Sequence, residues 1–454
     1  MTDTRVLTLL VLAALCAAPA TSLAQGVDQV TAVPPNLLLS NYDSVPVGPS
    51  GGLEGSAFVA RVGDPSATWF NPAGLSRQTT AEISGSAGVY EYTSVAPQSF
   101  SNTGGSVQQL PNFAGFTFQV REGLTAGVVA LTTNSWSQGM DMELIRPVTS
   151  GQERLAYSAD SEFGRRIFAT GVGYQRGAWR AGGGFAFSQM DLRLVTSISD
   201  RIADMSGLRT VLVAARASGS ALQLRTQGGV QFDTPHVRFG AAIRTPGLTI
   251  HRNGAVTLDG ALDGPTASLG ASLFDAEAEF EYRLPWEMHG GAAYVRDRVE
   301  VELNVQGYTP IAAYSMLSTG NPTLIYGDTG AGTPPTVVSR PFDGLTSASN
   351  GVVNVSLGGH VQVMRDRDFR IHTSFGSNQS PVAPEDEVFN KVDLLTWTLG
   401  VSGTIARFQF ASGLNWRSGA ANDILVRNLW NGESVQTNVD VRSVGFIYSI
   451  GYQF

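Results

Sequence analysis

The final stretch of the chain, residues 442–454, alternates without interruption between two kinds of side chain. A period of two is the pattern of a β-strand, in which successive side chains point to opposite faces. One face is apolar and rich in aromatic residues, the other is mostly small or polar, and the sequence stops on a phenylalanine. This pattern is typical of a closing strand in a membrane β-barrel, with lipid on one side and the lumen on the other. The apolar face carries Val444, Phe446, Tyr448, Ile450, Tyr452 and Phe454.

The same ending resembles the C-terminal signal that the bacterial barrel-assembly machinery reads. Phe454 is therefore the expected assembly signal, and that machinery is an expected partner. A half-buried edge strand of a soluble protein would alternate in the same way, so the choice depends on the rest of the chain.

The N-terminus has the features of a secretory signal peptide. Arg5 precedes an apolar run over residues 6–18, and the small residues Ser22 and Ala24 stand where a signal peptidase requires them. Residues 1–24 are therefore predicted to be removed on export.

Beyond residue 24, no uncharged apolar stretch is long enough to cross a bilayer as a helix. A membrane location would then require a closed barrel, because lipid cannot satisfy unpaired backbone groups. Charged residues make up 15% of the chain, against about 25% in soluble proteins. The net charge of -8 argues against a nucleic-acid partner. The one cysteine, Cys16, lies in the signal peptide, so no disulfide is expected.

Several interior runs alternate in the same way and have the length of a strand that crosses lipid. In one of them, four carboxylates share a face, which predicts that this face lines a solvated lumen. The runs are residues 274–282, 298–305, 353–363, 369–375 and 408–416, and the carboxylates are Asp275, Glu277, Glu279 and Glu281.

Segments rich in Gly, Pro, Ser, Thr and Asp separate these runs and are predicted to be external loops, at residues 138–161, 311–350 and 378–390. One region looks helical, because apolar residues recur there at spacings of three and four. We expect a helix in an external loop, whose apolar face either packs on the barrel rim or captures a ligand. That face consists of Ile202, Met205, Leu208 and Leu212.

The segment over residues 52–76 is too rich in Gly, Ala and Pro for a lipid-facing strand, yet it contains Phe58, Trp69 and Phe70. Such a segment is predicted to lie inside the barrel as a plug, or hatch. Asn71 and Pro72 should form a tight turn in it. Gly74 should permit a close approach of the backbone to the wall.

This segment resembles the FadL/TodX family of outer-membrane transporters of hydrophobic compounds. The most specific match is Asn71-Pro72-Ala73-Gly74-Leu75, which leads into the expected strand 82–92, and residues 53–59 and 63–67 also match. The resemblance implies an all-β fold, a monomeric antiparallel barrel of roughly 14 strands with an N-terminal hatch in its lumen. The expected division is a signal peptide (1–24), an N-terminal extension with the hatch (25–78) and the barrel (79–454).

The resemblance also implies passive uptake of hydrophobic small molecules, such as long-chain fatty acids or aromatic hydrocarbons, across the bacterial outer membrane. Capture in an external groove, a pocket near the hatch and lateral exit through the wall are the implied steps. Outer-membrane lipid and lipopolysaccharide are the implied surroundings. The extension over residues 25–51 departs from the family pattern, so the N-terminal ligand contacts of the family have no assigned counterpart.

No enzyme, cofactor or metal site is expected. The Gly-x-Ser-x-Gly pattern at residues 48–52 lacks the flanking strand and helix of a nucleophile turn. The five histidines show no ligand spacing. A second hypothesis remains open, a barrel without transport function that serves as a scaffold or adaptor for surface or secretion machinery. An apolar tunnel that meets a gap in the wall would favour transport, and a solidly filled lumen would favour the scaffold.

Overall fold

The computed structural model describes most of the chain beyond the first 36 residues. The described residues are 37–55, 57–97, 104–148, 151–204, 207–264, 268–328, 336–364, 368–427 and 434–454. The predicted signal peptide and Met205 lie outside these ranges.

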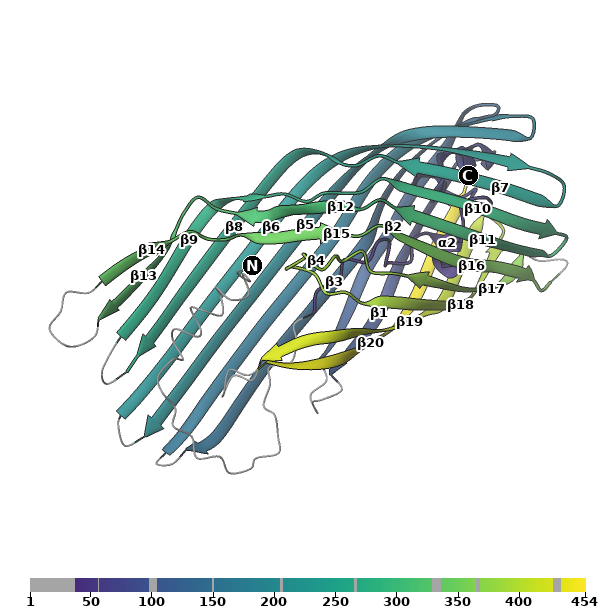
Figure 1. The fold of residues 1–454 in the computed structure, drawn as a ribbon. Coiled ribbons are helices and arrows are strands. Elements are labelled where there is room, and N and C mark those ends of the chain that lie inside the picture. Colours follow the sequence, from purple (N-terminus) through teal and green to yellow (C-terminus); the bar gives the residue numbers. More distant parts are fainter. Residues whose placement is uncertain are drawn as a thin grey trace.

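The described strands form one antiparallel sheet of twenty strands, which closes because β1 pairs with β20. Figure 1 shows an elongated barrel with the sequence colours running around its wall. The strands are β1 (Glu82–Pro97), β2 (Gly104–Arg121), β3 (Leu124–Val148), β4 (Gly151–Arg176), β5 (Trp179–Asp204), β6 (Gly207–Asp233), β7 (Val237–Arg244), β8 (Leu248–Asp263), β9 (Ser268–Phe280), β10 (Glu287–Arg296), β11 (Val299–Tyr308), β12 (Ile311–Ser318), β13 (Thr323–Asp328), β14 (Thr336–Arg340), β15 (Leu345–Ser349), β16 (Val352–Gln362), β17 (Phe369–Asn378), β18 (Asp393–Ile405), β19 (Phe408–Arg427) and β20 (Ser434–Gln453).

Several of these strands are consecutive segments of longer, interrupted strands of the wall, and we call each such complete strand a stave. β6 pairs with both β7 and β8, and β11, β12 and β13 pair in turn with β16, β15 and β14. Counted as staves, the wall is a closed barrel of 14 antiparallel strands. The predicted fold class is confirmed.

The closing strand also follows its prediction. Ile83 of β1 lies opposite Tyr452 of β20. The last hydrogen bond between the two ends of the wall runs from the Phe454 N–H to the Ala81 carbonyl at 3.0 Å. The aromatic face of β20 points out of the barrel, with Tyr448 45% exposed, whereas Ser449 on the opposite face is 1% exposed.

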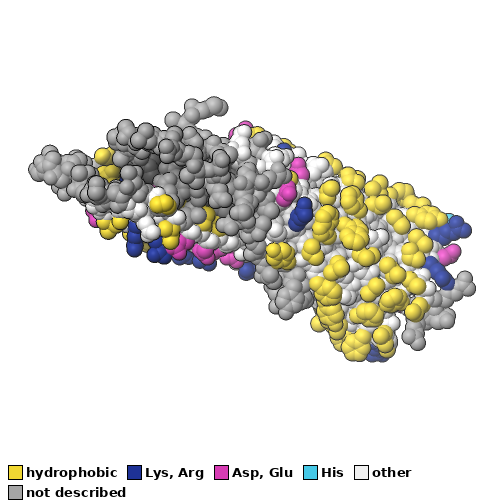
Figure 2. Space-filling view, turned by 90° about the horizontal axis from the view of Figure 1, so that it is seen from below, with side chains coloured by type: hydrophobic (Ala, Val, Ile, Leu, Met, Phe, Trp, Pro, Cys, Tyr) yellow, Lys and Arg dark blue, Asp and Glu magenta, His cyan; other side chains and the backbone are white. Residues whose placement is uncertain are grey.

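An apolar band surrounds one end of the barrel. On the outer face of β4, Val172 and Phe168 are exposed, and Arg166 and Glu162 replace them further along. In Figure 2, hydrophobic side chains cover much of one half of the molecule, and charged side chains lie beyond them toward both ends. The tight turns at residues 122–123 and 177–178 lie at the apolar end, as periplasmic turns do in bacterial barrels.

In the described part of the chain before the wall there are three helices: α2 (Pro49–Leu53), α3 (Ala67–Phe70) and the 3₁₀-helix η1 (Pro72–Arg77). Among the described residues, no helix has the length and hydropathy to span a bilayer. Residues 37–78, called the hatch below, form hydrogen bonds with β3, β6, β11 and β18 and therefore lie inside the barrel.

Two predicted external loops are wrong. Residues 138–161 belong to β3 and β4, and residues 311–350 contain β12 to β15. The third, residues 378–390, is a loop, but it folds inward, because Val388 and Phe389 are buried in the lumen.

The predicted external helix is also wrong, because its residues form the end of the β5–β6 hairpin. Ile202 pairs with Arg209, and Leu208 pairs with Ala203. Ile202 and Leu208 therefore lie on the two opposite strands of the hairpin. Leu208 and Leu212 point outward and are exposed, whereas Ile202 lies on the opposite face. These side chains do not form one capture face.

The acidic run of β9 is on the other side of the wall from its predicted place. Glu277 and Glu279 are exposed, while the alternate residues Ala278 and Phe280 are buried in the lumen. Glu279 pairs with Arg252 of β8 at 2.7 Å. At this level the outside is charged and the inside is apolar, which reverses the usual pattern of a water-filled barrel.

Candidate functional site

The hatch is fixed to the wall by the residues that carry the family resemblance. The Asn71 Nδ2 group donates to the carbonyls of Val59, Val230 and Ala241 at 3.1 to 3.3 Å, and its Oδ1 accepts from the Ala73 N–H. Asn71 thus caps η1 and binds wall and hatch together. Pro72 begins η1, in the position where its missing N–H costs nothing.

Glycine supplies the close contact of hatch and wall, but not where the sequence predicted it. A Cβ on Gly74 would collide with the Val62 carbonyl, which is part of the hatch itself. The close approach to the wall is made by Gly173 of β4 and Gly182 of β5, where a Cβ would collide with Pro72. Gly182 is the first of three consecutive glycines in β5, and Gly184 instead lies close to the Thr170 carbonyl of the neighbouring β4.

The aromatic residues of the hatch are buried as expected. Trp69 and Phe70 pack with Phe58 in a cluster that also includes Ile167 of β4. Phe58 and Phe70 meet edge to face, with ring centroids 6.4 Å apart. This cluster forms the floor of the lumen.

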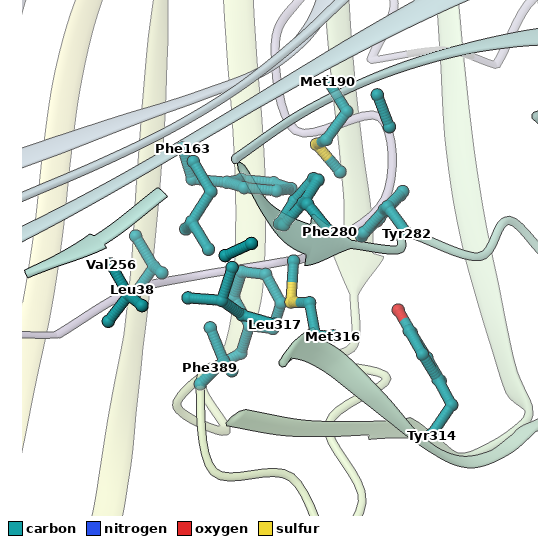
Figure 3. Packing of buried hydrophobic residues seen from close by; sticks show 14 of the residues in the cluster. Leu38, Phe163, Met190, Val256, Phe280, Tyr282, Tyr314, Met316, Leu317 and Phe389 are labelled. Atoms are coloured by element: carbon teal, nitrogen blue, oxygen red, sulfur yellow. The ribbon is translucent and has the colours of Figure 1, made fainter. Parts of the chain in front are cut away.

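Above the hatch lies a cluster of buried apolar side chains that pack against one another, and we call this cluster the chamber. It includes Phe163 of β4, Met190 of β5, Phe280 of β9, Met316 of β12 and Phe389 of the inward loop (Figure 3). Its other buried members are Leu38, Leu192, Ala221, Val256, Leu273, Ala278, Tyr282, Leu284, Tyr314, Leu317, Val382 and Val388. Flexible Met and aromatic side chains from many elements therefore converge on one apolar site.

Leu38 reaches into the chamber from the hatch. Figure 3 shows it beside Val256 and Phe389. Its N–H donates to the Asn390 Oδ1 and its carbonyl accepts from the Asn390 N–H, both at 2.8 Å. The inward loop therefore holds a leucine of the hatch in the chamber.

A basic cluster lies between chamber and hatch. Arg225 and Arg244 bond the carboxylate of Glu287 at 2.5 and 2.7 Å, and Arg244 stacks over the Trp69 ring at 3.6 Å. Arg165 is 1% exposed, and its nearest carboxylates, Asp43 and Glu287, are 3.6 and 3.7 Å away.

Arg165 differs from the other two arginines, because none of its guanidinium nitrogens has a hydrogen-bond partner among the described residues. Its neighbours on the inner face of β4 are Phe163, in the chamber, and Ile167, in the hatch cluster. An unsatisfied buried guanidinium is costly unless an acceptor completes it. The floor of the chamber thus presents donors suited to a carboxylate.

The wall changes its hydrogen bonding near this site. The β2–β3 ladder extends only from Arg121 and Leu124 to Phe113 and Leu131. Beyond it, within the described residues, β2 pairs with β1 alone and β3 with β4 alone. This separation of β2 from β3, called the split below, begins after Leu131. The next residue, Thr132, pairs with Arg166, which lies at the outer edge of the apolar band.

The start of the hatch, residues 37–47, lies against β3 at this split, and we call it the lumen segment. The Leu37 N–H donates to Gln138 Oε1 at 2.9 Å, and Trp136 Nε1 donates to the Leu37 carbonyl at 2.7 Å. The Val45 N–H donates to the carbonyl of Thr133, the residue of a β-bulge in β3. The lumen segment therefore covers the inner side of β3 where β2 leaves it.

A third set of contacts fixes the hatch at the apolar end of the barrel. Arg61 forms ion pairs with Glu54 of the hatch and with Glu302 of β11, the latter at 3.1 Å. His360 and His372 each place Nδ1 beside Glu54. Burial opposes the Glu54 charge, but Arg61 and the two histidines outweigh it and hold the pKa of Glu54 well below its usual range.

The sequence predicted hatch and substrate-site residues at Phe58, Trp69, Phe70, Asn71, Pro72 and Gly74, and all six are buried in this segment. Their contact with a substrate stays a prediction. Sequence reasoning missed Arg165 and the lumen segment. In a β-strand, neighbouring side chains face opposite sides, so Arg165 faces the lumen and Arg166 faces outward. The sequence could have shown this only if the course of β4 had been known.

No protein-family model and no curated protein matches the sequence. Solved structures do match. A FadL homologue of Pseudomonas aeruginosa aligns with a TM-score of 0.60 at 10% identity, over 92% of this chain and 99% of that one. The toluene transporter TbuX of Ralstonia pickettii aligns with a TM-score of 0.55 at 14% identity, over 90% and 99%.

The toluene transporter TodX of Pseudomonas putida aligns with a TM-score of 0.56 at 12% identity, over 91% of this chain and 99% of that one. At identities this low, the structural alignments establish a shared fold and nothing more. The predicted resemblance is thereby confirmed at the level of the fold: this chain is a 14-stranded barrel built like a FadL homologue and two toluene transporters.

Proposed function

We propose that this protein is an outer-membrane channel for the passive uptake of hydrophobic compounds that carry a carboxylate, such as long-chain fatty acids. The observation that carries the proposal is the buried, unsatisfied Arg165 at the floor of an apolar chamber. A fatty acid offers both matching parts, an apolar chain and an anionic head. The fold neighbours named as toluene transporters support hydrophobic passage in general.

The chamber supplies the apolar part of the route. A lipid chain gains about 0.8 kcal/mol for each methylene that leaves water, so an apolar lumen lowers the barrier that the polar surface of lipopolysaccharide imposes. Leu38 occupies part of this space. We infer that a substrate chain displaces Leu38, which requires the two bonds to Asn390 to open.

The basic cluster selects the head group. All three guanidinium nitrogens of Arg225 are bonded to Glu287 or to carbonyl groups, and Arg244 leaves only Nε without a partner. All three guanidinium nitrogens of Arg165 lack a partner among the described residues. A bidentate guanidinium–carboxylate pair is stronger and more directional than a neutral hydrogen bond. A hydrocarbon such as toluene would leave Arg165 unsatisfied.

The route continues sideways at the split between β2 and β3. A strand edge without partners is the part of a barrel wall that can open without breaking a ladder. The lumen segment covers this edge through Leu37 and Val45. Displacement of the segment by the substrate would couple occupancy of the chamber to exit toward the outer leaflet. No reaction is needed, because passage requires only binding that is neither too weak nor too tight.

The test compares Arg165→Ala with Arg166→Ala, neighbours on β4 that face the lumen and the outside. Loss of a charge-assisted hydrogen bond costs about 1.5–3 kcal/mol, so Arg165→Ala should weaken uptake of a labelled long-chain fatty acid about tenfold or more. Uptake of toluene should stay within about twofold. Arg166→Ala should resemble wild type for both compounds.

Heat-modifiable migration on gels confirms that each variant is folded before uptake is compared. Equal loss of both substrates in folded Arg165→Ala would remove the head-group role. Wild-type uptake of both would remove it as well. If the folded wild-type protein carries neither compound, the scaffold hypothesis replaces transport.

A further inference from the structure

Two histidines and a carboxylate meet inside the barrel, although they are far apart in sequence. His360 of β16 and His372 of β17 are direct cross-strand partners, with ring centroids 5.0 Å apart. Glu54 reaches them from the hatch, with Oε1 at 2.9 Å from Nδ1 of His360 and 2.8 Å from Nδ1 of His372. The three donor atoms lie within 4.8 Å of one another.

Burial makes this cluster unlike a surface group of histidines. The side chains of Glu54 and His372 are fully buried and that of His360 is 9% exposed. A Zn²⁺ ion bound to such donors has bonds of about 2.0–2.2 Å. The Glu54–histidine distances of 2.8 and 2.9 Å would lengthen by roughly half an ångström if these atoms surrounded an ion with such bonds.

The surrounding charges favour a cation. Arg61 pairs with the carboxylates of Glu54, Glu300 and Glu302, and Arg238 lies 3.8 Å from Glu300. Within these ion pairs, three carboxylates face two guanidinium groups. Buried charge without a partner is costly, so a bound cation would compensate for it.

His372 also has the outer contact that histidine ligands usually make. Its Nε2 lies 2.7 Å from the Ser402 Oγ, which fixes the orientation of the ring while Nδ1 faces Glu54. A hydrogen bond to the second ring nitrogen orients a ligating histidine and tunes its affinity for metal.

A second group of similar residues shows the contrast. Asp43, Glu287 and His289 also converge. There, however, Arg165, Arg225 and Arg244 surround the carboxylates and leave positive charge in excess. This group is not suited to a cation and provides an internal control.

We propose that Glu54, His360 and His372 bind a divalent transition-metal ion of the Zn²⁺ class, which ties the hatch to β16 and β17. The coordination is three protein ligands with one position left for water or a small anion. The ion closes a link between the chain before the barrel and strands more than 300 residues later. Its role is structural, and it is independent of the substrate route above Arg165.

The experiment measures metal content directly. Protein without a histidine tag is purified in detergent, equilibrated with ZnCl₂, passed over a desalting column and analysed by mass spectrometry for zinc. Wild type should retain about one Zn²⁺ per chain. His372→Ala should lose it, and His289→Ala should retain it.

A milder change separates binding from folding. Ser402→Ala keeps all three donors and should weaken Zn²⁺ affinity about 10- to 100-fold, as loss of an outer contact does. Folding of each variant is checked by heat-modifiable migration. The proposal is overturned if wild type retains no stoichiometric zinc, or if folded His372→Ala retains as much as wild type.

Discussion

At the scale of single residues, Asn71 shows how one amide can join two parts of the molecule. It bonds the hatch through Val59 and Ala73 and the wall through Val230 and Ala241. The sequence predicted a turn-forming Asn with Pro72, because short side chains that bond nearby backbone favour such turns. The bonds to the wall could not be predicted, since they depend on strands more than 150 residues away.

We predict that Asn71→Ala loosens the hatch without unfolding the barrel. Each buried carbonyl left without its donor costs about 1–3 kcal/mol, and the lost bonds lie at the hatch rather than in the strand ladders. Single-channel recordings should show higher conductance for small ions than wild type.

Asn71→Asp is the matched variant, because it keeps the shape and the acceptor but loses both donors. It should leak at least as much as Asn71→Ala. Wild-type conductance in both folded variants would show that the hatch is held by packing instead.

At the scale of elements, strand parity was more informative than local composition. The runs over residues 298–305, 353–363 and 408–416 were predicted as strands from alternation alone and are strands. The helix expected around Ile202 to Leu212 was wrong because apolar residues from both arms of a hairpin mimic a helical spacing when read as one segment. Local sequence does not show where a hairpin turns.

The inward loop gives a prediction at this scale. Asn390→Ala removes the side-chain bond to the Leu38 N–H, worth about 0.5–1.5 kcal/mol, and so favours release of Leu38 from the chamber. Fatty-acid uptake at low substrate concentration should rise about 2- to 10-fold.

Asn321→Ala is a suitable control, since Asn321 is exposed and bonds Phe274 in an outer hairpin, away from the chamber. A fall in uptake for Asn390→Ala, with the control unchanged, would mean that the loop forms the binding site rather than holding it shut.

At the scale of the whole molecule, closure depends on the two ends of the wall. Alternation in β20 was readable from sequence, and its pairing with β1 completes the barrel. The number of staves followed from the resemblance, whereas the breaks between β7 and β8 or between β15 and β16 did not. The breaks coincide with Pro246-Gly247 and Asn350-Gly351, but such residues also occur in true loops, so the sequence does not show that the same stave continues beyond them.

Deletion of Phe454 tests the closing strand. The deletion removes the backbone bond to Ala81 and the terminal aromatic residue expected to act as the assembly signal. The amount of folded, heat-modifiable protein in outer membranes should fall, while total synthesis measured by immunoblot stays the same. Unchanged folded protein would exclude Phe454 as the signal.

The unusual length of β3 to β6 has a consequence for where solutes first meet the protein. These strands have 25 to 27 residues. At about 3.3 Å per residue and a tilt of roughly 40° they rise on the order of 65 Å, while the lipid-facing band of a barrel is about 25 Å tall. Some 40 Å of wall would then stand above the bilayer. The mouth of the barrel would therefore open far from the lipid headgroups, so a dilute, poorly soluble solute could enter the wall before it reached the membrane surface.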